Sequence, residues 1–222
     1  EMVLNKGIKV YSSLDFEAQK SAQASVRKGL REVDKRQGYR GAKKSIDVAS
    51  EEAITALLTK ERNRLIDDSY ETFQVFPDGT TDAYGEFAFY QKKNDKGEVI
   101  SNIPPYIKKG DIVEAIVTNV DDENEIVFVR FAESQGIIPF QTMAWARTPD
   151  ASKIYGQWVH IKKPSQALKA GDVIDIKIEK TTAKKVDVPK AFKMDLKNYA
   201  EVSLEQSPRV EAALLSYDLK TD

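Results

Sequence analysis

The stretch 107-IKKGDIVEAIVTNVDDENEIVFVRF-131 decides the fold of this chain. Within it, residues 111–120 and 125–131 are rich in apolar, β-branched and aromatic residues, which is typical of β-strands. The residues Asp-Asp-Glu-Asn between them are turn formers. The stretch therefore predicts a hairpin of two strands.

The beginning of this hairpin recurs later in the chain. Residues 107–117 and 168–178 both read apolar-Lys-x-Gly-Asp and continue with alternating apolar residues. Glycine allows a bend with positive φ, and the aspartate starts the next strand. We expect further strands at 70–76, 84–91, 136–140 and 172–178, with no helices between them. This spacing indicates a small β-barrel of the oligonucleotide-binding (OB) type, in which such a turn is common.

The first 66 residues follow a different pattern. Residues 8–14 alternate as a strand, and Asp15 can cap a helix that ends at a left-handed Gly38. Its apolar stripe consists of Ala18, Ala22, Val26, Leu30 and Val33. A second helix is expected from Ser50 to about Ile66, with Ile54, Leu57, Leu58 and Leu65 facing inward.

A lone first strand would leave its backbone groups unpaired, so it needs a partner elsewhere in the chain. The alternating tail, residues 210–218, is the candidate. The prediction is an α+β chain in which a barrel at 67–200 is inserted into a second domain. That second domain contributes residues 1–66, and 201–222 as a returning strand.

Several blocks of the chain resemble class A (bifunctional) penicillin-binding proteins of the 1A type. They arrive in the order of that family: 12-SSLD-15, 33-VDKRQGYRG-41, 145-WAR-147, 168-LKAGDVI-174 and 204-LEQSPRVEAALLSYDLKT-221. Ala212, Leu219 and Asp222 depart from the pattern, and residues 43–105 match it only loosely.

The resemblance implies an OB-like domain inserted near the start of a transpeptidase domain, most of which is not in the chain. It implies a parent peptidoglycan synthase that polymerises glycan chains from lipid II and cross-links peptides. It also implies a periplasmic location, on a protein anchored in the inner membrane. For some members it implies docking of a regulatory lipoprotein.

No transpeptidase centre is expected in this segment. The letters Ser-x-x-Lys occur at Ser25–Lys28, where the lysine could assist a nucleophilic serine. Ser25 nevertheless falls in mid-helix, and a companion Ser-x-Asn motif is absent from the sequence. Residues 220–222 read Lys-Thr-Asp, where the family motif has Lys-Thr-Gly.

Cofactors and metals are not expected either. The sequence has no cysteine, which excludes disulfides and thiolate ligands, and its single histidine is His160. The acidic residues at 120–125 are too closely spaced for an EF-hand, and a hairpin turn explains them better. No apolar run is long enough to cross a bilayer.

Charge points to a protein partner more than to nucleic acid. The chain is nearly neutral at −1, but residues 67–137 carry 15 acidic and 6 basic residues, and residues 138–200 carry 6 and 12. An acidic barrel half opposes phosphates, so its aromatic residues are expected in the core. A single-stranded nucleic-acid binder remains the alternative. The candidate docking patch lies in the basic half and consists of Trp145, Arg147, Trp158, Lys162 and Lys163.

Overall fold

A computed structural model describes residues 14–69, 87–154, 157, 159–183 and 195–215 of the chain. The chain divides into two compact units, Glu1–Asp34 with Pro208–Asp222, and Lys35–Ser207. We call the second of these the barrel unit, and each unit is described by itself.

Two predicted helices and four predicted strands are present, in the predicted order. Residues 87–91, within the predicted strand 84–91, form no strand, and the predicted strand at 70–76 lies outside the described residues. A short helix at 140–143 lies between strands where no helix was expected. The helices are α2 (Phe16–Gln37), α3 (Glu51–Asp68) and the short α4 (Phe140–Met143), with 3-10 turns at Pro164–Gln166 and Leu196–Asn198. The strands are β1 (Lys44–Ser45), β2 (Lys92–Lys93), β3 (Val99–Ser101), β4 (Ile112–Asp121), β5 (Ile126–Phe131), β6 (Ser134–Pro139), β7 (Asp172–Lys180) and β8 (Ala200–Glu205).

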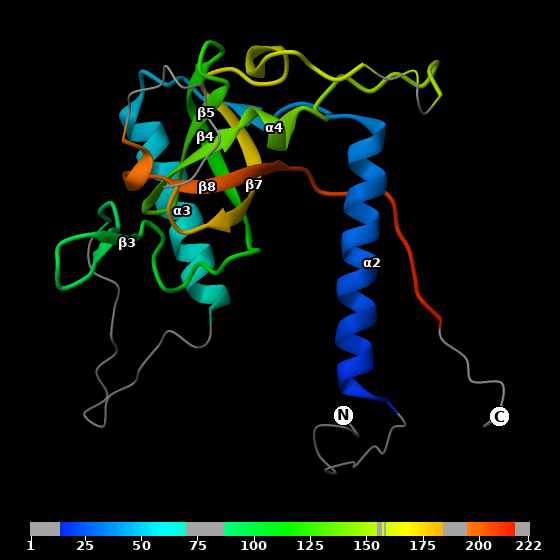
Figure 1. The fold of residues 1–222 in the computed structure, drawn as a ribbon, viewed down its shortest axis with the longest axis horizontal. Helices are drawn as coiled ribbons and strands as arrows, with labels where there is room; N and C mark the ends of the chain where they lie inside the picture. Colours follow the sequence, from blue (N-terminus) through cyan, green and yellow to red (C-terminus); the bar gives the residue numbers. More distant parts are fainter. Residues whose placement is uncertain (1–13, 70–86, 155–156, 158, 184–194, 216–222) are drawn as a thin grey trace. The chain divides into compact units, whose positions relative to one another are not determined.

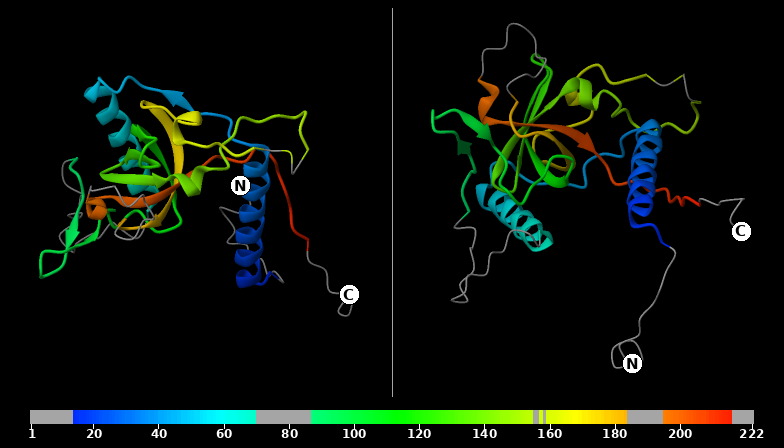
Figure 2. Two further views of the ribbon diagram at one scale, coloured as in Figure 1. Left: turned by 45° about the horizontal axis from the view of Figure 1, so that its top comes forward. Right: turned by 60° about the horizontal axis from the view of Figure 1, so that its bottom comes forward.

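Five strands close a barrel (Figure 1). Strands β4, β5 and β6 form an antiparallel meander, and β7 pairs with both β4 and β8. Strand β8 then completes the circle by running parallel to β6, with Gly136 opposite Ala200. Further views show β8, in orange, beside β7, in yellow (Figure 2). The predicted α+β class with an OB-like barrel is confirmed.

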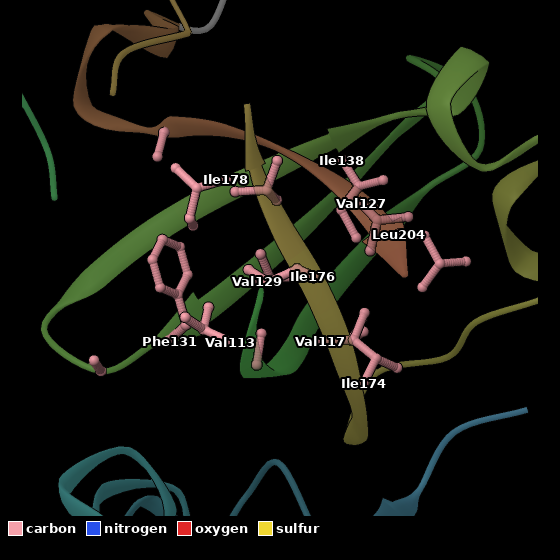
Figure 3. Packing of buried hydrophobic residues seen from close by; sticks show 14 of the residues in the cluster. Val113, Val117, Val127, Val129, Phe131, Ile138, Ile174, Ile176, Ile178 and Leu204 are labelled. Atoms are coloured by element: carbon pink, nitrogen blue, oxygen red, sulfur yellow. The ribbon is translucent and has the colours of Figure 1, made fainter. Parts of the chain in front are cut away.

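The barrel core follows from the alternation seen in the sequence. Inward-pointing residues come from all around the barrel (Figure 3) and include Val113, Val117, Val127, Val129, Phe131, Ile138, Ile174, Ile176, Ile178 and Leu204. The predicted hairpin turn is present as well, because Asp121 accepts a hydrogen bond from the N–H of Asn124 at 2.9 Å. One face of each strand is thereby removed from water, which is the main stabilising term of such a fold.

Helix α3 covers part of the outer barrel surface. Ser50 caps it by accepting a hydrogen bond from the N–H of Ala53 at 3.3 Å, as predicted. Its apolar residues Ile54, Leu57 and Leu58 pack on Ile116 and Val173 of β4 and β7. The sequence assigned this helix to the second domain, within 1–66, whereas the structure has it in the barrel unit. Sequence periodicity shows that a helix buries one face but not which element covers that face.

The end of the barrel also differs from the predicted boundary at residue 200. Strand β8 begins at Ala200, and its residues Val202 and Leu204 are fully buried in the barrel. The apolar alternation recognised in the sequence began only at Val210. Residues 210–215 form no strand in the described part of the chain, and the rest of the predicted returning strand lies outside that part.

Helix α2 begins as predicted. The side chain of Asp15 accepts hydrogen bonds from the N–H groups of Glu17 and Ala18, at 2.9 and 3.0 Å. The predicted apolar stripe is only partly covered, and Val33 is 44% exposed. In the same unit, Asp34 accepts a hydrogen bond from the N–H of Arg209 at 3.3 Å. The start of the tail therefore lies beside the end of this helical segment. Residues 8–13, where the opening strand was predicted, lie outside the described residues.

Candidate functional site

The chain enters and leaves the barrel unit at one place, which we call the neck. It consists of Lys35–Arg40 on the way in, Glu205–Ser207 on the way out, and Trp145–Arg147 beside them. The Gln206 amide donates to the carbonyl of Gly38 at 2.9 Å and accepts from the N–H of Arg40 at 3.2 Å. An ion pair joins Lys35 Nζ to the buried Glu205 carboxylate at 2.6 Å. The two ends of the barrel unit are thus held together by side chains of this chain.

Two residues of the predicted docking patch are part of the neck. Arg147 is buried, donates to the carbonyl of Arg36 at 2.8 Å, and its own carbonyl accepts from the N–H of Tyr39 at the same distance. The ring of Trp145 meets that of Tyr39 edge-on at 6.0 Å, with Lys35 Nζ 5.3 Å from the indole centroid. Both side chains are therefore engaged within the chain.

The backbone at the neck requires glycine. Gly38 has φ +102°, which confirms the predicted left-handed end of α2. A Cβ at this position would come within 2.6 Å of the carbonyl oxygen of Arg147. Burial raises the pKa of the neighbouring Tyr39 hydroxyl, and Asp172 and Asp175 add to the effect. The neck is thus a close-packed structural joint.

The remaining residues of the docking patch lie elsewhere. Lys162 and Lys163 are exposed, and Lys163 Nζ lies 3.1 Å from the carboxylate of Asp122. Hydrogen bonds from the hydroxyl and the N–H of Ser165, together with Lys163, hold the pKa of Asp122 below its usual value. Trp158 lies outside the described residues.

Apolar side chains accompany these lysines. In the segment between α4 and β7, Ile154 is 70% exposed and Val159 is 67% exposed. We call Ile154, Val159, Lys162 and Lys163 the arm surface. Lys162 and Lys163 belong to the predicted docking patch, whereas Ile154 and Val159 were not part of that prediction.

The described residues bring no catalytic group together around Ser25. The serine is exposed in the middle of α2, and the side chain of Lys28 is 80% exposed and lies 3.9 Å from Glu32. A nucleophilic serine needs a nearby base held in a fixed position, and neither side chain here is packed into such a position.

Neither a metal-binding cluster nor a membrane-spanning helix occurs in the described ranges of the chain. No group of three or more His, Asp or Glu side chains there could hold a metal ion. His160 is exposed, with its Nδ1 at 3.1 Å from the carbonyl of Ala144. None of the described helices has the length and hydropathy to cross a membrane.

The outer face of β4–β6 was missed by the sequence analysis. Tyr199 packs edge-on against Phe128 at 5.5 Å on one side of this face, and α3 covers the other side. Between them lies a groove of about 450 Å³, whose lining includes Glu51, Phe89 and Arg130. The sequence analysis expected the aromatic residues of this region in the core. Phe87 is only partly buried, where it packs against the α3 cluster, and Phe89 is 47% exposed. Tyr70, Phe73 and Phe76 lie outside the described residues.

A five-stranded barrel with a three-strand meander and a parallel β6–β8 closure defines the chain as an OB-type barrel protein. The chain belongs to the penicillin-binding protein family, because residues 85–210 match the family described as penicillin-binding protein OB-like domain. A comparison with curated protein sequences gives no match. Membership of this family implies a role in peptidoglycan synthesis and a cell-wall context outside the cytoplasm.

Proposed function

We propose that this chain is a non-catalytic docking and regulatory segment of a bifunctional class A penicillin-binding protein of the 1A type. The parent enzyme polymerises glycan chains from lipid II and cross-links peptides through modules outside this segment. In that setting the barrel unit is periplasmic and belongs to a protein anchored in the inner membrane.

The neck is the observation that carries this proposal. An inserted domain must enter and leave its host at neighbouring points, and here Gln206 hydrogen-bonds to Gly38 and Arg40 across the two connections. The blocks that resemble class A enzymes at 33–41, 145–147 and 204–221 all include neck residues. A barrel joined to its host in this way can receive a partner without separating its own ends.

The docking partner that we propose is a regulatory lipoprotein of the cell-wall machinery, and the arm surface is its contact. Exposed apolar residues can be buried by a partner, which stabilises the complex. The lysines beside them attract an acidic partner and speed its association. Neutralising one favourable charge at the edge of an interface mainly slows association, so reversing two charges has a larger effect.

Charge reversal on the arm surface tests the docking role. The double variant Lys162→Glu/Lys163→Glu should weaken binding of the purified lipoprotein about tenfold or more, as measured by biolayer interferometry with the chain immobilised. The matched control is Lys92→Glu/Lys93→Glu, which reverses two adjacent exposed lysines on β2 and should leave binding unchanged. Equal losses in both variants, or no binding by the wild type, would contradict the assignment.

Penicillin labelling tests the non-catalytic role. Fluorescent penicillin incubated with the native chain should leave no covalent label after denaturing electrophoresis, because Ser25 lies exposed in mid-helix. A Ser25→Ala variant, run beside it, should give the same blank lane. Stoichiometric labelling that disappears in this variant would overturn the assignment.

A further inference from the structure

The groove on the outer face of β4–β6 is the feature that the docking role leaves unexplained. It has a volume of about 450 Å³, within the range of small-ligand sites. Its lining comes from β4, β5 and β6, and Tyr199, which also lines it, belongs to the connection between β7 and β8. In OB barrels, the corresponding strands and loop bind oligonucleotides or oligosaccharides.

The two charged side chains that line the groove, Arg130 and Glu51, have opposite charges. Arg130 Nη1 donates to the Glu51 carboxylate at 2.8 Å, and its guanidinium lies 4.9 Å from the centroid of the Phe89 ring. A phosphate chain would have to compete with Glu51 for this arginine. It would also approach a part of the barrel, residues 87–137, that carries 9 acidic and 6 basic residues.

Unused hydrogen-bonding groups line the same groove. Arg130 Nε is buried and has no hydrogen-bond partner among the described residues. The side-chain amides of Asn119 and Gln135 also line the groove, and neither makes a side-chain hydrogen bond in the described part of the chain. Asn119 follows a register shift between Val117 and Asn119 in the β4–β5 pairing, and such irregularities re-aim side chains.

These groups suit a neutral ligand that both donates and accepts hydrogen bonds. An amide side chain offers donors and an acceptor together, which complements both a hydroxyl group and an acetamido group. The rings of Phe89 and Tyr199 provide apolar faces against which the C–H groups of a sugar ring can pack. Neutral amides with aromatic walls are more compatible with a carbohydrate than with a polyanion.

We propose that this groove binds an N-acetylated oligosaccharide strand. Asn119 and Gln135 hydrogen-bond its acetamido and hydroxyl groups, and Phe89 packs against a sugar ring. The groove shares no residue with the arm surface, so glycan binding is separable from lipoprotein docking. A barrel with both sites could hold a glycan strand while a regulatory protein is bound.

A titration with N-acetylchitotetraose tests the proposal. Amide resonances of ¹⁵N-labelled chain should shift at Asn119, Arg130 and Gln135, with a dissociation constant of about 0.1–1 mM. The variant Asn119→Ala/Gln135→Ala should weaken binding at least about fivefold, since two amide contacts are lost. The control Gln141→Ala removes an exposed amide on α4 and should bind as the wild type does.

Three results would overturn the proposal. One is the absence of resonance shifts up to about 10 mM sugar in a chain whose spectrum shows that it is folded. Another is unchanged affinity in the double amide variant. The third is that a thymidine oligonucleotide shifts the same resonances and binds more tightly than the sugar, with an affinity that falls steeply as the salt concentration rises. Lipoprotein binding measured on the same variants should be unaffected, so failure here leaves the docking role standing.

Discussion

Replacement of Gly171 by alanine is expected to lower the free energy of unfolding by more than about 4 kcal/mol. Gly171 has φ +90°, and a Cβ there would lie 2.2 Å from the carbonyl oxygen of Ile46. The left-handed conformation alone costs a non-glycine residue about 1–2 kcal/mol. To relieve the clash, the backbone at Gly171 or Ile46 must also move, and hydrogen bonds restrain it on both sides. The N–H of Ile46 donates to Gly171 at 2.8 Å, and Gly171 donates to Val117 at the same distance.

Urea denaturation followed by circular dichroism measures the loss in the free energy of unfolding. In a thermal melt of the same variant, the melting temperature should fall by about 10 °C or more. The matched control is Gly110→Ala, at the equivalent position of the other repeat. Gly110 has φ +94°, but a Cβ there would meet nothing within 4 Å. Its loss should be only about 1–2 kcal/mol. Similar losses in the two variants would show that conformation, and not crowding, dominates at Gly171.

These two glycines show which features of the fold the sequence predicts and which it does not. The repeated Lys-x-Gly-Asp pattern predicts the same turn at both places, and both glycines do have positive φ. The crowding at Gly171 depends on Ile46, more than 120 residues away in the chain. Local patterns report backbone conformation and buried faces, whereas contacts between distant segments depend on packing that a single sequence does not display.

The same limit explains the other differences. Strands β4 to β7 were predicted because each is a short run rich in apolar residues, with turn residues nearby. The strands on which α3 packs were not predicted, because an apolar stripe does not identify the element that covers it. Strand β8 was not predicted as part of the barrel for the same reason, since its buried residues do not show which sheet they join. Among the candidate site residues, Trp145 and Arg147 were selected for their chemistry, but such residues serve equally well inside a joint such as the neck. The groove was missed because its residues come from five separate segments: Glu51, Phe89, β4, β5–β6 and Tyr199.

A buried ionic group attaches α3 to the barrel. Arg62 Nε of α3 lies 3.0 Å from the carboxylate of Glu133, in the turn between β5 and β6, and both side chains are about 10% exposed or less. The hydroxyl of Tyr106 donates to the other oxygen of this carboxylate at 2.7 Å. A buried pair of this kind adds little stability over an apolar substitute, but removal of one partner leaves the other charge without compensation.

Arg62→Met should therefore lower the free energy of unfolding by about 3–5 kcal/mol, because the Glu133 carboxylate stays buried without its cation. The double variant Arg62→Met/Glu133→Gln removes both charges, keeps an acceptor for Tyr106, and should recover at least about 1 kcal/mol of that loss. The control on the same helix is Asp68→Asn, which breaks an exposed pair with Arg64 at 2.9 Å and should cost less than about 1 kcal/mol. Urea denaturation of the wild type, Arg62→Met, Glu133→Gln and the double variant gives the coupling energy between the two side chains. If the loss in the double variant equals the sum of the losses in the two single variants, Glu133 and Arg62 act independently of each other, and the proposed ionic attachment is wrong.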